Sequence, residues 1–218
     1  MLWTSTIGLK VIMAVSGILL VGFVLGHMAG NLQVFLGREV YNGYAEFMQG
    51  LGELLWVARI TLLVLLVAHV VSAVKLNQVN RQARPRPYLH LRTQRTSPHA
   101  KIMFLSGLVI LAFVLYHLAH FTIRSVHTEY MNPADATDVY TFFVQSFQNP
   151  LVTITYVVAN LLLASHLSHA TSSMFRTLGL SVGEYRPVFE KIGPAIGVLV
   201  AVGNLSMPLA CLFGILTV

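Results

Sequence analysis

Six of the nine histidines in this chain lie inside long apolar stretches of the sequence. Burying an ionisable side chain among apolar residues costs free energy, so such histidines usually have a function. Neutral imidazole binds metal ions and transfers protons near neutral pH, which makes both kinds of chemistry candidates. The six are His27, His69, His117, His120, His166 and His169. The other three, His90, His99 and His127, fall between the stretches and are predicted to be solvated.

Five apolar stretches must position these side chains: residues 7–36, 54–76, 102–123, 151–175 and 192–218. Each is longer than the roughly 20 residues that a helix needs to cross the ~30 Å core of a bilayer. Since backbone polar groups cannot stay unpaired in lipid, we expect every stretch to be a transmembrane helix. The first is too long for a signal peptide and is predicted to be retained. The predicted fold is an all-α integral membrane protein, one domain over 1–218 with five helices in an up-down bundle.

Composition supports a membrane protein and narrows its chemistry. Hydrophobic residues make up 56% of the chain and charged residues 10%, against about 25% charged in soluble domains. The net charge of +6 comes mainly from one segment between helices, which fits orientation in a membrane and argues against nucleic acid as a partner. The single cysteine, Cys211, cannot form an intrachain disulfide or ligate an iron–sulfur cluster alone. Any redox group held by this chain needs other ligands.

The segments between the stretches predict the orientation. Residues 37–52 and 125–150 contain glycine or Asn-Pro turn signals, are predicted to be connectors and carry most of the acids. Residues 75–101 carry seven Lys or Arg and no acid, so by the positive-inside rule they face the cytoplasm. We therefore expect a protein of the bacterial cytoplasmic membrane with its N-terminus inside and, after five crossings, its C-terminus outside.

The place of each histidine along its helix predicts its depth in the membrane, because consecutive helices run in opposite directions. At 1.5 Å per residue, His27 and His117 lie ~24 and ~22 Å along helices that run outward. His69 and His166 each lie ~22 Å along helices that run inward. The sequence thus predicts two pairs in layers about 15 Å apart: His27 with His117 near the outer surface, and His69 with His166 near the inner one.

Two facing neutral imidazoles are the axial ligands that a six-coordinate b-type haem needs. Two such pairs predict two haems b and an electron path across the membrane. A single intramembrane histidine often only hydrogen-bonds a neighbouring helix, but that explanation fits four matched histidines poorly. His120 and His169 lie one turn from His117 and His166, so spacing alone does not decide which member of each couple binds iron. Gly22, Gly26 and Gly30 clear one helix face beside His27, either for a flat ring or for helix packing.

Six motifs follow one another in the first 180 residues. They are H-M-A-G-N-L-Q-V-F-L-G at 27–37, N-G-Y-A-E-F at 42–47, L-L-W-V-A-R-I at 54–60, A-H-V-V-S-A-V-K-L at 68–76, Y-H-L-A-H-F at 116–121 and S-H-L-S-H-A at 165–170. The ordered set resembles the single-chain, five-helix dihaem cytochrome b subunits of succinate:quinone oxidoreductases and quinol:fumarate reductases. Each motif alone is weak, and the order of the set is specific.

The resemblance implies that His117 and His166, with His27 and His69, are the haem ligands, and that His120 and His169 have supporting or proton-handling roles. It implies a membrane anchor of succinate dehydrogenase that relays electrons between an iron–sulfur subunit and quinone, expected to be menaquinone. FAD, the iron–sulfur clusters and the dicarboxylate chemistry would belong to a flavoprotein and an iron–sulfur subunit docked on the inner face. Ala164 and Ser165 stand where some quinol:fumarate reductases have a proton-carrying glutamate, which favours succinate oxidation.

Charged residues near the predicted ligands suggest further roles. Haem propionates need cations, and the candidates are Lys75 and Arg176 for the inner haem and Arg59, Arg38 or Arg124 for the outer one. Arg59 is equally well explained as an arginine that reaches the membrane interface. Quinone chemistry near the outer haem needs a titratable group, for which Glu46 and Glu53 are candidates. The rival is an inner quinone site built from Ser5, Lys10 and Tyr88.

Two other classes of protein fit parts of this pattern. A cytochrome b anchor of a hydrogenase or formate dehydrogenase would share the paired histidines, but its partners usually dock on the outer side, whereas the charges here favour an inner partner. A transporter or structural membrane protein would use the histidines only for packing. An optical spectrum of the purified protein discriminates this last class, because it would lack haem bands.

Overall fold

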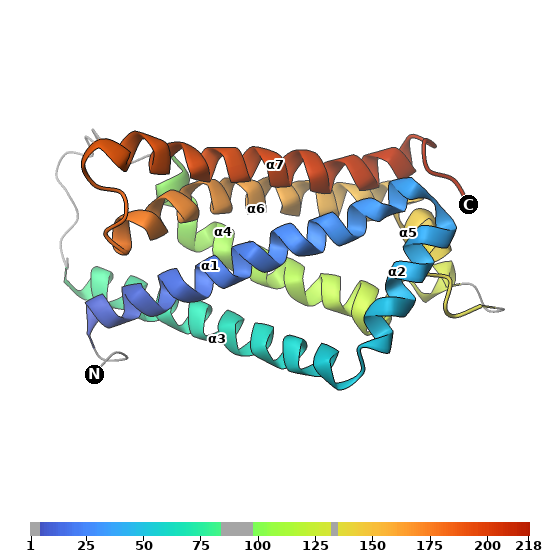
Figure 1. Cartoon of the computed structure of the whole chain (residues 1–218), viewed down its shortest axis with the longest axis horizontal. Helices are drawn as coiled ribbons and strands as arrows, with labels where there is room; N and C mark the ends of the chain where they lie inside the picture. The colour runs from blue at the N-terminus through green and yellow to red at the C-terminus, as the bar shows by residue number, and fades with distance from the viewer. Residues whose placement is uncertain (1–4, 84–97, 132–134) are drawn as a thin grey trace.

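The computed structural model describes residues 5–83, 98–131 and 135–218, and within these ranges it is helical, with no strand. Five long helices dominate it (Figure 1). They are α1 (Thr6–Asn31), α3 (Glu53–Gln82), α4 (Pro98–His117), α6 (Pro150–Thr177) and α7 (Arg186–Leu212). All five, α4 together with the turn that follows it, are long and apolar enough to cross a membrane, as the sequence predicts.

The long helices run up and down along the long axis of the molecule (Figure 1). One end, called here the N-terminal end of the bundle, holds the N-terminus, the end of α3 and the start of α7. The opposite end, called the C-terminal end, holds the C-terminus and two shorter helices, α2 (Arg38–Gly50) and α5 (Val139–Gln148). α6 packs along α7 and α4, while α1 packs against α3 and α6.

Glycines let α6 and α7 approach closely. A Cβ atom added at Gly197 would lie 2.8 Å from the Ala164 carbonyl oxygen and 2.9 Å from the Ser168 Cβ atom, so a larger residue cannot fit without movement. Further along the same interface, Asn204 donates a hydrogen bond of 2.8 Å to Asn160. The two helices therefore form a tightly packed pair against which the histidine-bearing helices are placed.

The predicted connectors 37–52 and 125–150 are not simple loops, because they contain α2 and α5. In α2, Tyr41 and Tyr44 recur at the three-residue spacing of a helix face, and Tyr41 packs on Phe143 of α5 with ring centres 5.5 Å apart. α5 begins at the Asp138 cap, whose carboxylate accepts from the Thr141 backbone N–H at 3.2 Å. The sequence indicates connectors here because glycines occur in the first segment and Asn149-Pro150 ends the second, and both are typical of turns.

The helices also differ from the predicted stretches at their ends. α3 continues from 76 to Gln82, and α7 begins at Arg186 rather than at 192, because polar residues that end an apolar stretch can still be helical. α1 tightens into a 3-10 turn at Leu32–Leu36, and α4 widens into a π-helical turn at Leu118–Thr122. Both irregular turns lie at the C-terminal end.

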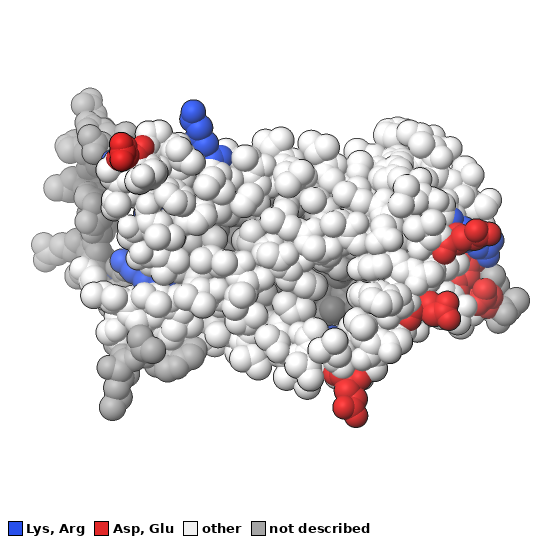
Figure 2. Space-filling view, viewed as in Figure 1, with Lys and Arg blue, Asp and Glu red and all other residues white. Residues whose placement is uncertain are grey.

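α3 is the least covered of the long helices. Only Ser72 and Leu76 are buried on it, and both lie toward the N-terminal end. Its exposed apolar side chains include Trp56, Ile60 and Leu63. The face drawn in Figure 2 shows an uncharged band across the middle of the molecule, with acidic side chains gathered mainly at the C-terminal end. This distribution suits helices whose middle parts face lipid.

Candidate functional site

His69 of α3 and His166 of α6 both lie toward the N-terminal end of the bundle. The Nδ1 atom of His69 lies 3.2 Å from the Met13 carbonyl oxygen and 3.3 Å from the Ser16 hydroxyl. Because a carbonyl oxygen can only accept, Nδ1 of His69 carries the proton. The Nε2 atom of His69 therefore keeps its lone pair for a ligand bond.

A serine fixes His166 in the same way. Nδ1 of His166 lies 3.0 Å from the hydroxyl of Ser106, which donates its own hydrogen to the Met103 carbonyl oxygen at 3.0 Å. The serine oxygen must then accept from His166, so Nδ1 carries the proton here as well. Both histidines of this pair thus present an unprotonated Nε2 atom, as metal-bound histidines do when their other nitrogen donates a hydrogen bond.

A glycine packs against each histidine of this pair. Gly107 lies against His166, where an added Cβ atom would be 3.5 Å from a ring carbon, and Gly17 lies similarly close to His69. One turn beyond His69, the buried hydroxyl of Ser72 has no hydrogen-bond partner among the described residues, and the same holds for the buried hydroxyl of Thr171 on α6. Such unpaired buried groups are uncommon and often have a bound partner.

His27 of α1 and His117 of α4 form the second pair, toward the C-terminal end. Their ring centres are 5.7 Å apart and the rings are nearly perpendicular, at 88°. Asn31 donates to the His27 carbonyl oxygen at 2.8 Å and lies 3.3 Å from its Nε2 atom, which places the lone pair of His27 at Nε2. Nδ1 of His117 lies 3.4 Å from the Tyr156 hydroxyl.

The pair has open space on the α1 side. His27 is exposed although it lies in a long apolar helix. A Cβ atom added at Gly22 or Gly26 would meet no atom within 4 Å, as a face cleared for a ring requires. Gly30 has a different role from the one the sequence suggests, because the Tyr44 ring of α2 lies directly against it.

The spacing of His27 and His117 fits a haem iron. Two imidazoles bound to one iron at about 2 Å per bond have ring centres roughly 6 Å apart, close to the spacing of His27 and His117. In the described part of the chain, no three His, Cys, Asp or Glu side chains lie together as ligands for a bare metal ion. A porphyrin needs only two protein ligands, since it supplies the other four itself.

His120 lies in the π-helical turn and is fully buried. Its Nδ1 atom is 3.0 Å from the Tyr156 hydroxyl, and its Nε2 atom is 3.1 Å from the Ser146 hydroxyl of α5. The ring of His127 lies 4.9 Å away, between centres. His127 is not simply solvated as the sequence suggests: it is half-buried, and its Nε2 atom bonds the Tyr116 hydroxyl at 2.9 Å.

The structure places the charged candidates at the surface. Lys75 and Arg176 are exposed on the last turns of α3 and α6, toward the N-terminal end. Arg59 is exposed near the start of α3, with its guanidinium 5.1 Å from the centre of the Trp56 ring. This stacking fits an arginine at the membrane interface better than one that points at a haem.

Glu46 and Glu53 are exposed at the C-terminal end, on α2 and the first turn of α3, toward the end that holds His27 and His117. Of the rival set, Ser5 caps α1 by accepting from the Gly8 backbone N–H at 3.0 Å, and Lys10 is exposed. Tyr88 and most of the basic segment 75–101 lie outside the described residues. Both glutamates therefore lie at the end of the bundle where the sequence predicts the quinone reaction.

Asp138 joins α2 to α5 at the C-terminal end. Its buried carboxylate accepts from Arg38 in an ion pair and from Asn42 at 3.0 Å, besides capping α5. Burial alone would raise the pKa of Asp138, but the hydrogen bonds from Thr141, Asn42 and Arg38 lower it to about 2. Arg38 is therefore engaged by Asp138, and Arg124 donates to the Ala136 carbonyl oxygen at 2.9 Å.

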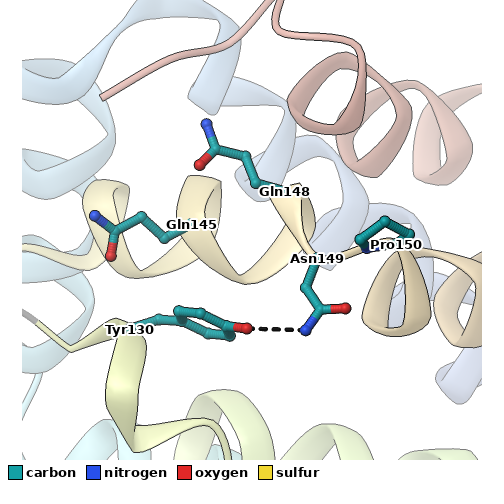
Figure 3. Close-up of a pocket in the computed structure, with 5 residues that line it drawn as sticks. All are labelled: Tyr130, Gln145, Gln148, Asn149 and Pro150. Carbon is teal, nitrogen blue, oxygen red and sulfur yellow. Dashed lines mark hydrogen bonds between the residues drawn. The ribbon is translucent and has the colours of Figure 1, made fainter.

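An open pocket lies beside this end of the bundle, where α5 meets α6 (Figure 3). Tyr130, Gln145, Gln148, Asn149 and Pro150 line it. Asn149 donates to the Tyr130 hydroxyl at 2.9 Å across it. None of the histidines or glutamates singled out by the sequence contributes to its lining, so it is separate from the paired-histidine sites.

No protein-family model, curated protein or solved structure matches this chain. The resemblance carried by the motifs therefore remains a prediction. What the fold and the site define is a class: an all-helical protein with five helices suited to a membrane and a pair of histidines toward each end of the bundle. The spacing in the sequence predicts the same two groups of histidines. It does not predict their hydrogen-bond partners Ser16, Ser106, Tyr156 and Ser146, which only the packing of the helices reveals.

Proposed function

We propose that this chain is the membrane anchor and electron-transfer subunit of a succinate:quinone oxidoreductase. It would hold two b-type haems, one between His69 and His166 and one between His27 and His117, and relay electrons between an iron–sulfur partner and quinone. The observation that carries the proposal is the arrangement itself: each end of the bundle holds histidines from two different helices, and Nδ1 of His69 and of His166 donates a hydrogen bond that leaves Nε2 unprotonated.

The residues of the chain would bind, orient and insulate the haems. A bis-histidine haem supplies reversible one-electron transfer without opening a site for substrate. Ser16 and Ser106 fix the ring orientation of His69 and His166. Lys75 and Arg176 lie on the same helices toward the N-terminal end, where anionic propionates would need cations.

The proposed direction is succinate oxidation, with the N-terminal end facing the cytoplasm and the partners docked there. Ala164 stands where some quinol:fumarate reductases have a proton-carrying glutamate. It is buried, and its carbonyl oxygen lies against Gly197 of α7. A long charged side chain would not fit that interface. This leaves proton exchange to groups at the two ends of the bundle.

We place the quinone reaction near His27 and His117, with Glu46 or Glu53 exchanging the proton. Both glutamates are exposed at that end, and Ser5 of the rival site is already engaged as a helix cap. Reduction of quinone takes up protons together with electrons, so a titratable group must stand near the reacting oxygens.

Purification of the native complex in detergent tests the main proposal. The expected result is two haems b per copy of this chain, low-spin in the oxidised and reduced optical spectra, together with a flavoprotein and an iron–sulfur protein that co-purify. One haem per chain would contradict the two-pair arrangement. Co-purification with hydrogenase or formate dehydrogenase subunits would assign the chain to the other class of dihaem anchor.

A further inference from the structure

Tyr156 of α6 links the histidine pair at the C-terminal end to two further buried side chains. Its hydroxyl lies 3.4 Å from Nδ1 of His117 and 3.0 Å from Nδ1 of His120. His120 in turn lies 3.1 Å from the Ser146 hydroxyl through Nε2. Tyr156 is 4% exposed and the other two are fully buried, so water does not compete for these bonds. The contacts join α4, α6 and α5.

We propose that Tyr156, held by His120 and Ser146, positions His117 as a haem ligand and lowers the reduction potential of the haem at that end. The inference rests on the proposed haem function. With Nε2 of His117 on iron, its Nδ1 carries the proton and donates to the Tyr156 oxygen. Tyr156 then donates its single hydrogen to Nδ1 of His120, and His120 donates from Nε2 to Ser146. The donors of His117, Tyr156 and His120 each meet an acceptor in this arrangement.

The sign of the effect follows from the direction of these bonds. A ligand imidazole whose N–H donates a hydrogen bond is a stronger base. A stronger base stabilises ferric iron more than ferrous iron, so the potential falls. A chain of hydrogen bonds that all point the same way strengthens each member. At the other end, His69 and His166 donate to Ser16 and Ser106. Each serine hydroxyl then donates to a carbonyl oxygen of the helix that carries the serine.

Redox titration of the Tyr156→Phe complex, followed optically, tests the inference. Phenylalanine keeps the ring and removes only the hydroxyl. We expect the midpoint potential of the haem that His117→Ala removes to rise, its ferric low-spin EPR signal to shift, and the other haem to stay unchanged. Tyr116→Phe is the matched control, because its hydroxyl bonds His127 at 2.9 Å and has no bond to His117, and it should shift neither potential.

Substitution of His120 separates positioning from packing. His120→Gln keeps an acceptor for the Tyr156 hydroxyl, so it should move the potential less than His120→Leu does. Loss of only that haem from Tyr156→Phe, with both haems kept in Tyr116→Phe, would also support a positioning role. Unchanged potentials in a Tyr156→Phe complex with two haems would overturn this inference alone. A parent complex without haem would overturn the proposed function as well.

Discussion

The two ends of the bundle hold their histidines by different means. At the N-terminal end, His69 and His166 donate to serines that bond back to their own helices, so each arrangement depends on short stretches of two helices. At the C-terminal end, His117 is linked to Tyr156 of α6 and, through His120, to Ser146 of α5. The first site is therefore robust to changes elsewhere, whereas the second depends on how α5 and its flanking segments pack. The two proposed haems should therefore differ in how strongly they respond to substitutions outside their own helices.

Removal of a proposed ligand should produce the largest difference between the two ends, in haem content. His69→Ala or His166→Ala should remove the haem at the N-terminal end and keep the other, and His27→Ala or His117→Ala should do the reverse, because a low-spin haem needs both axial bonds. Haem quantitation and the reduced optical spectrum measure this. His169→Ala is the control and should retain both haems. A single variant that loses both haems would show that the two ends are not independent.

Loss of the acids at the C-terminal end should slow quinone turnover. A positioned acid or base typically contributes a hundredfold or more, so the Glu46→Gln, Glu53→Gln double variant should lose at least about tenfold in succinate:quinone activity. Both haem spectra and succinate oxidation with an artificial acceptor should be unchanged. Normal quinone turnover in the double variant would move the quinone site to the N-terminal end.

The ion pairs at the two ends should differ in their contribution to stability. Asp138 is buried, caps α5 and accepts from Asn42, while its partner Arg38 is half exposed, so Asp138→Ala should destabilise the fold by about 2 kcal/mol, mainly through the lost cap and hydrogen bonds. Arg186 and Glu190 pair across one exposed turn of α7, and Glu190→Ala should leave stability unchanged within error. Thermal unfolding in detergent measures both. Equal losses would mean that α2 and α5 are not held together by Asp138.

The pH dependence of stability should show the smallest effect. The pKa of Asp138 is about 2 in the folded protein, below its ordinary value of 3.8, so folding favours the charged form. The stabilisation from Asp138 is therefore complete above the ordinary pKa and is lost as the pH falls through about 2. Between pH 5 and pH 2.5 the melting temperature of the parent should fall further than that of Asp138→Asn. Parallel curves would contradict this assignment.

Sequence reasoning reached the five long helices because an apolar stretch of more than 20 residues leaves the backbone little choice. It also grouped the histidines by depth, since helical rise converts position into distance. It missed α2 and α5, which are held together by Tyr41 on Phe143 and by the Arg38–Asp138 ion pair, contacts between residues about 100 positions apart. The half-buried place of His127 was missed because it depends on how the chain after α4 folds back onto Tyr116 and His120.

The π-helical turn after His117 has a consequence for how this helix can vary among related chains. Such a turn, closed here by the bond from the Ile123 N–H to the Leu118 carbonyl oxygen, contains one residue more than an α-helical turn. An insertion absorbed there leaves the register of the preceding helix intact, so His117 continues to face His27. Only the residues from the turn onward are rotated, which places His120 against Ser146 and Tyr156. The proposed iron ligand and its buried support can therefore change independently in sequence.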